Sequence, residues 1–122
     1  NLNQAREDFE VKKDYASAAK KFLDAQIEDP SNLKHVYNRA VSQYYNKEYN
    51  KAAEGFRASS EAKDKNLQQR SLFNLGNSLV KSGDLAGAIK AYDKAIKIDK
   101  DDKHALENKK WAKKAFKLRM TL

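Results

Sequence analysis

The fold is decided by residues 72–99, which read LFNLGNSLVKSGDLAGAIKAYDKAIKID. Gly83 divides this stretch into two segments of helical composition. Glycine is the natural residue for the left-handed backbone that ends a helix, and the Asp84 carboxylate can accept from the free N–H groups of the helix that follows. The stretch therefore predicts two helices joined by a tight turn.

The second of these helices recurs twice upstream. The segments are DYASAAKKFLDA from Asp14, EYNKAAEGFRAS from Glu48 and DLAGAIKAYDKA from Asp84, displaced by 34 and then by 36 residues. Aligning the three segments gives four columns of equivalent residues with similar side chains: Tyr15, Tyr49, Leu85; Ala18, Ala52, Ala88; Phe22, Phe56, Tyr92; and Ala25, Ser59, Ala95. Their spacing puts them on one helical face, where small residues alternate with bulky ones. Such a face predicts close packing against another helix.

A partner helix precedes each segment and has columns of its own: Leu2, Val36, Leu72, and Arg6, Ala40, Gly76. Asp14 is a candidate cap for the second helix. Pro30 ends the first unit, after which Ser31 or Asn32 can start the next helix. These signals predict repeats at 1–32, 33–68 and 69–102, with two inserted residues in the turn before the third repeat. Residues 103–122 predict a terminal capping helix whose apolar stripe is Leu106, Ala112, Ala115 and Phe116.

The third repeat, with its Leu75-Gly76 pair and the pattern A-x3-aromatic-x2-A from Ala88, resembles the signature of the tetratricopeptide-repeat (TPR) family. The resemblance implies one all-α domain over 1–122, a right-handed solenoid of seven helices. Departures are visible in the second repeat, where Arg39 and Gln43 occupy usually apolar positions. We expect them to loosen the packing between the first two repeats.

In this family the first helix of every repeat lines a concave groove. One groove column reads Gln4, Asn38, Asn74 and Asn108. Asparagine suits a helix interior poorly, so three in register suggest a use other than folding. A carboxamide both donates and accepts, and a row of them can hold the main chain of an extended peptide. The alternative is that these side chains bridge adjacent repeats or face water.

The predicted function is therefore a protein-protein interaction scaffold that holds a peptide of a partner protein. The expected binding residues are Lys34, Tyr37, Asn38, Val41, Tyr44, Tyr45, Arg70, Phe73, Asn74, Asn77, Lys81 and Asn108. Among them the cations Lys34, Arg70 and Lys81 favour acidic segments. A subclass of the family clamps its partner's terminal carboxylate with Lys, Asn, Asn, Lys and Arg. Only Asn38 and Arg70 match that set, so a complete clamp is not expected.

No enzyme is predicted, and no catalytic residue, metal or cofactor. The chain has no cysteine, no phosphate-binding loop and no nucleophile motif. His35 and His104 stand alone and are interpreted as surface residues. The acidic run Glu7, Asp8, Glu10 is interpreted as a solvated face, because neighbouring carboxylates on a helix point in different directions.

The net charge of +8 leaves other partners open. From Lys97 onward there are eight Lys and one Arg against three Asp and one Glu. The terminal helix is thus an alternative site for nucleic acid or another polyanion, an acidic protein or a membrane surface. Exposed Trp111 and Phe116 would instead favour self-association.

Neither a membrane-spanning run nor a leader is evident. The start at Asn1 suggests a fragment of a longer protein. The use of lysine and asparagine is typical of bacteria. The compartment is not predicted.

Overall fold

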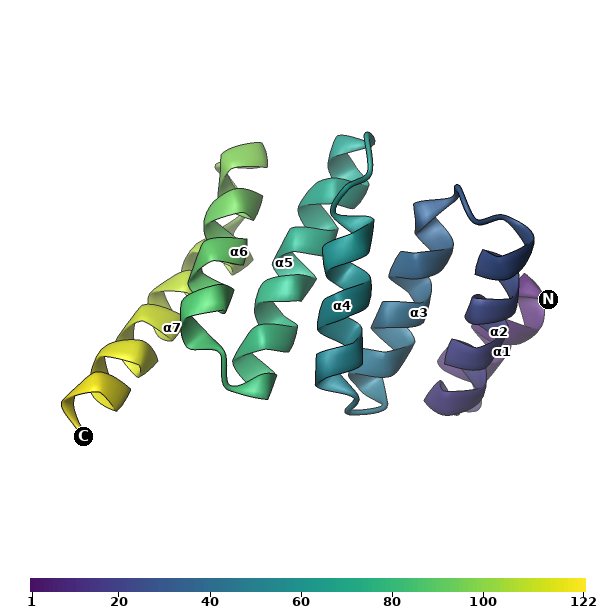
Figure 1. Cartoon of the computed structure of the whole chain (residues 1–122), viewed down its shortest axis with the longest axis horizontal. Helices are drawn as coiled ribbons and strands as arrows, with labels where there is room; N and C mark the ends of the chain where they lie inside the picture. Colours follow the sequence, from purple (N-terminus) through teal and green to yellow (C-terminus); the bar gives the residue numbers. More distant parts are fainter.

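The computed structural model describes all residues 1–122, which form seven α-helices and no strand. The helices are α1 (Leu2–Glu10), α2 (Tyr15–Glu28), α3 (Leu33–Tyr45), α4 (Tyr49–Ser59), α5 (Lys65–Ser82), α6 (Leu85–Ile98) and α7 (Lys103–Thr121). They follow one another in chain order, from α1 and α2 at one end of the array to α7 at the other (Figure 1). The all-α helical-repeat solenoid predicted from the sequence is confirmed. No helix is long and apolar enough to cross a membrane.

The predicted helix boundaries have the expected capping chemistry. Gly83 has a φ of 92° and ends α5, and the Asp84 side chain accepts from the Gly87 N–H at the start of α6. Asp14 caps α2 in the same way, by accepting from the Ser17 N–H. Asn32 caps α3. Each carboxylate or amide satisfies an N–H that the helix itself leaves unpaired.

The main core runs through α3 to α7, and its largest fully buried side chains are Phe56 and Tyr92. Two glycines let the helices of a pair approach closely. A Cβ on Gly55 would lie 2.7 Å from the Ala40 Cβ, and one on Gly76 would lie 2.4 Å from the Tyr92 ring. The backbone of α5 thus fits directly against the aromatic ring of α6, which is why only glycine suits position 76.

The first helix pair has a separate, smaller core of Ala5, Ala18 and Phe22, with Phe9 packed against it. The α1–α2 pair therefore shares no buried apolar cluster with the rest of the array. Helices α2 and α3 nevertheless pack against each other about as extensively as α4 and α5 do, so the expectation that Arg39 and Gln43 loosen the packing between the first two repeats was wrong.

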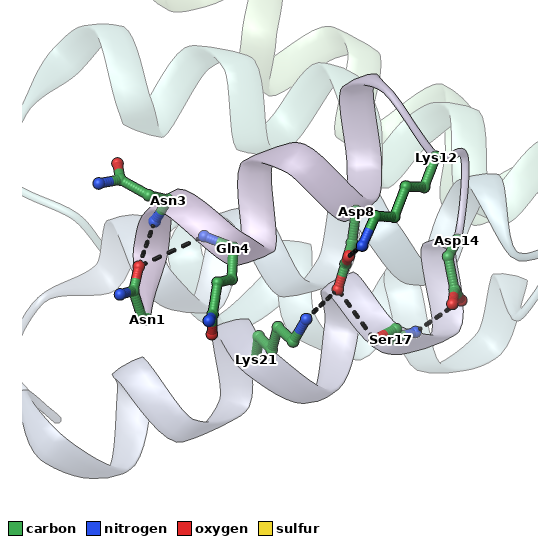
Figure 2. Close-up of polar contacts among 8 residues, drawn as sticks. All are labelled: Asn1, Asn3, Gln4, Asp8, Lys12, Asp14, Ser17 and Lys21. Atoms are coloured by element: carbon green, nitrogen blue, oxygen red, sulfur yellow. Dashed lines mark hydrogen bonds and ion pairs between the residues drawn. The ribbon is translucent and has the colours of Figure 1, made fainter.

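A polar cluster joins α1 to α2 (Figure 2). Asp8 is only 3% exposed, so interpreting it as part of a solvated face was wrong. Its carboxylate accepts from the Lys21 ammonium and from the Ser17 hydroxyl, the latter at 2.9 Å, and Lys12 lies 3.7 Å away. The hydrogen bonds from Lys21 and Ser17 hold the pKa of Asp8 below its usual value of 3.8. Two hydrogen bonds and two nearby cations compensate its carboxylate for the water it loses on burial.

The seam between α2 and α3 is also polar. Gln43 is buried, as is the Gln26 side-chain oxygen, which has no hydrogen-bond partner. The surface prediction for His35 was wrong: its side chain is buried, and Nε2 lies 3.6 Å from an Asp29 carboxylate oxygen. The other ring nitrogen of His35, Nδ1, is buried without a hydrogen-bond partner. His104 is exposed as expected.

Helix α7 packs on the array through small residues. Ala105 and Ala112 are fully buried, whereas Leu106 and Phe116 of the predicted stripe are 43% and 36% exposed. Alanine lets α7 approach closely, and this leaves the bulkier side chains outside. Lys109 pairs with Asp93 of α6, and Arg119 donates to the Gly83 carbonyl at 2.7 Å.

The insertion before the third repeat lengthens a helix as well as a loop. Helix α5 begins at Lys65, seven residues before Leu72, whereas α3 begins only three residues before the matching Val36. Asp64 caps this added turn, and Leu67 within it is buried. The first turn of α5 therefore adds apolar contact to the third repeat.

Candidate peptide-binding groove

Two hollows lie along the helices expected to line the groove. The first, of about 260 Å³, is lined from α3, α5, α6 and α7 by Tyr44, Asn77, Val80, Lys81, Tyr92, Asn108 and Trp111. The second, of about 180 Å³, is lined from α1, α2 and α3 by Arg6, Phe9, Glu10, Phe22, Asn38 and Val41. We call these the C-terminal and N-terminal hollows. Six of the twelve predicted binding residues line one or the other.

An amide node forms the C-terminal hollow. The Asn77 side-chain oxygen accepts from the Tyr92 hydroxyl at 2.6 Å and from the Asn108 amide at 3.1 Å. Burial raises the pKa of Tyr92, so its hydroxyl remains a donor at neutral pH. Asn77 and Asn108 thus fix each other's orientation across α5 and α7. Each keeps hydrogen-bonding capacity that these two bonds do not use.

A second polar contact links α3 to α5. The Asn74 amide donates to the Tyr37 hydroxyl at 2.9 Å, and the Arg70 guanidinium carbon lies 5.2 Å from the centre of the Tyr37 ring. The Tyr37 ring also packs edge-on against Phe56, which belongs to the core. Burial raises the pKa of Tyr37, although the Arg70 charge opposes this. The ring therefore holds an exposed cation and an oriented amide side by side.

Asn38 is placed differently from the other two asparagines. It lines the N-terminal hollow, and its half-buried side chain makes no hydrogen bond within the protein. Asn74 bonds Tyr37, and Asn108 bonds Asn77. The amide row is therefore partly engaged in bridging repeats, the alternative use considered above, while Asn38 keeps both donors and its acceptor.

Tyr44 and Tyr45 belong to an aromatic cluster at the C-terminal end of α3. Tyr45 stacks near Phe9 and Tyr15, with ring centres 5.3 and 5.5 Å away, and yet remains 55% exposed. Tyr44 packs edge-on against Tyr49, and burial is the main cause that raises its pKa. These rings connect the first helix pair to the second across the divided core. They also present apolar surface to solvent.

The remaining predicted residues lie on the same helices. Lys34, Arg70 and Lys81 are exposed, and none of them forms an ion pair within the protein. Phe73 is half-buried, with its ring centre 6.1 Å from that of Tyr92. Val41 is half-buried and packs on the core. The three cations are therefore available to an anionic ligand.

Sequence reasoning missed residues that line both hollows. Trp111 follows Asn108 by three positions, as Asn77 follows Asn74 and Val41 follows Asn38, so the column itself could have identified it. Phe9 and Phe22 also line the N-terminal hollow, although Phe22 is buried in the smaller core and Phe9 packs against that core. No sequence signal distinguishes such lining residues from core residues, because both are apolar positions on the packed face of a helix.

Comparison with known proteins agrees with this architecture. A family model described as tetratricopeptide repeat matches residues 69–102. The TPR repeat-containing protein MJ1428 of Methanocaldococcus jannaschii is 36% identical over 98 residues. The match covers 76% of this chain and only 16% of that relative, so the chain corresponds to a small part of it.

Two solved structures share the fold. The Sgt2 TPR domain from Aspergillus fumigatus superposes with a TM-score of 0.86 at 20% identity, covering 99% of this chain and 80% of that one. The first TPR of Spaghetti (RPAP3), bound to the HSP90 peptide SRMEEVD, gives 0.85 at 16% identity, covering 94% and 89%. The chain belongs to the tetratricopeptide-repeat family. This family and fold are those of protein-interaction modules rather than enzymes.

Proposed function

We propose that this protein binds an extended, acidic segment of a partner protein along α1, α3, α5 and α7. The observation that carries the proposal is the arrangement at Tyr37, where exposed Arg70 and the oriented Asn74 amide lie together beside a half-buried ring. A guanidinium next to an amide suits a peptide carboxylate and its adjoining main chain. The likeness to an RPAP3 domain that carries an acidic peptide supports the same reading.

The two hollows set the register of the ligand in this proposal. A side chain of the peptide enters the C-terminal hollow beside Trp111 and Lys81, and another enters the N-terminal hollow beside Asn38. Aromatic and arginine side chains contribute most to such interfaces. Asn38 bonds the peptide main chain with its whole carboxamide, whereas Asn74 and Asn108 use the groups that Tyr37 and Asn77 leave free.

The experiment is a pull-down with the chain at low and at moderate salt, followed by identification of retained proteins and affinity measurement with the recovered segment. The double variant Asn38→Ala/Asn74→Ala is expected to weaken binding roughly 10- to 30-fold, since each lost hydrogen bond contributes about 1 kcal/mol. Asn50→Ala/Asn66→Ala is the matched control, because both side chains are exposed and lie outside the hollows.

Helical content measured by circular dichroism should be the same in all three proteins. Equal affinity of the Asn38/Asn74 variant and the native chain would refute the role of the amides. Retention of nucleic acid alone, lost at moderate salt, would favour the alternative of polyanion binding through α7.

A further inference from the structure

Positive charge is concentrated on α7, away from the groove residues. This helix has six lysines and one arginine against a single acidic residue, Glu107, which gives seven positive charges less one negative, or +6. The whole chain carries +8. Most of the net charge of residues 1–122 therefore lies on α7, at one end of the array (Figure 1).

The lysines form a ridge on the outer side of α7. Lys103, Lys110, Lys114 and Lys117 are separated by seven, four and three residues, so they share one helical face. That face is opposite Ala105 and Ala112, which are fully buried against the array. All four lysines are exposed, and none is in an ion pair. We call them the lysine ridge.

Large apolar side chains border the lysine ridge on both sides. Trp111 and Leu118, seven residues apart, are 57% and 67% exposed on the side nearer the C-terminal hollow. On the α6 side, Ile89 and Phe116 line an open hollow of about 600 Å³ together with four lysines. Its wall is almost wholly apolar, because the lysines contribute their methylene stems.

We propose that the outer face of α7 binds an anionic lipid surface. Helices that lie on membranes combine lysines with Trp, Phe and Leu, so that ammonium groups meet the headgroups while apolar side chains enter the boundary layer. Lysine is a compact point charge, whereas paired carboxylates or phosphates are better held by the planar fork of arginine. A helix with six lysines to one arginine suits a diffuse charged plane.

The arrangement of side chains on α7 agrees with a flat partner. Within this chain, α7 lies at the opposite end of the array from α1 and α2 (Figure 1). The lysine ridge is bordered by apolar residues on two sides, whereas a peptide ligand would contact only one of them. The groove residues of α3 and α5 stay free in this arrangement, and Trp111, which lines the C-terminal hollow, is the residue that the two surfaces share.

The chain contains one tryptophan, Trp111, which reports on the proposed contact directly. The experiment adds phosphatidylcholine vesicles with and without phosphatidylglycerol, and follows Trp111 emission and co-sedimentation at low salt. A blue shift and sedimentation with the anionic vesicles alone are the expected result. Lys110→Gln/Lys114→Gln/Lys117→Gln should weaken partitioning roughly 150-fold, because each lysine at an anionic surface contributes about 1 kcal/mol.

The matched control removes the same charge elsewhere. Lys20→Gln/Lys63→Gln/Lys100→Gln changes three exposed lysines on other segments and should partition as the native chain does. Equal loss in both triple variants would overturn the proposal, as it would show a general effect of net charge. So would the absence of a shift with anionic vesicles, or tighter binding to a polyglutamate peptide or an oligonucleotide at the same salt.

Discussion

The first and third helix pairs have different side chains, with different interactions, at equivalent buried positions. At one shared position the first pair has Asp8 and the third has Ser78, both buried. Ser78 donates to the Asn74 carbonyl one turn back, so its hydroxyl is satisfied within its own helix. Asp8 instead needs Lys21 and Ser17 from the neighbouring helix. The helices of the third pair are held together by close steric packing, and those of the first pair are held by a polar cluster.

The adjoining column shows the same contrast. Gly76 admits the Tyr92 ring against the α5 backbone, whereas Arg6 at the matching position is exposed. A close steric fit gains dispersion contacts and excludes water at any pH. An ion pair stabilises the fold only while both partners are charged. Removing the two charges from water also costs much of the electrostatic free energy that the pair gains. The first pair should therefore be the less stable end of a one-dimensional array.

Truncating the shared aromatic column is the strongest test of this contrast. Phe56→Ala in the main core should cost about 3–5 kcal/mol and lower the stability of α3 to α7 together. Phe22→Ala, in the smaller core, should mainly lower the local stability of α1 and α2. Hydrogen exchange measured segment by segment distinguishes the two outcomes. Uniform loss of protection in both variants would contradict the division of the core.

Filling the close contact of the third pair should have the next largest effect. Helix propensity alone would make Gly76→Ala stabilising by about 1 kcal/mol. The added Cβ would lie 2.4 Å from the Tyr92 ring, so we expect a net destabilisation of about 1–3 kcal/mol in urea unfolding. The control is Gly76→Ala/Tyr92→Leu. Its stability should exceed the sum of the single effects; simple additivity would rule out the clash as the cause.

Acid should weaken the first pair before it weakens the third. Because the folded-state pKa of Asp8 is below 3.8, this carboxylate adds stability that is complete above the unfolded-state value. That stability is lost as the pH falls through the lower, folded-state pKa. Asp8→Asn should lower the melting temperature at neutral pH and flatten its dependence on pH in the acid range.

Asp24→Asn serves as the control for Asp8→Asn, since Asp24 is exposed on α2 and forms no ion pair. It should leave the melting temperature and its acid dependence close to those of the native chain. An acid profile of Asp8→Asn that parallels the native one would show that other carboxylates govern the transition.

The order of the helices and several of their caps could be predicted from the amino-acid sequence. Columns such as Phe22, Phe56 and Tyr92 repeat a local packing pattern, and Gly83 with Asp84 encodes a turn within a few residues. Such signals can be recognised in a sequence because helix periodicity and capping depend on residues that are close together in the chain. They also identified the helices that carry the candidate groove. The repeat boundaries and the binding residues remain predictions.

The burial and pairing of polar side chains became evident only from the packed helices. Asp8 and His35 were read as solvated, and helix packing buried them beside Lys21 and Asp29. Asn38, Asn74 and Asn108 form one column in the sequence, yet neighbouring helices bring partners to two of them and leave the third free. Burial and pairing depend on residues distant in the chain, so periodicity cannot specify them.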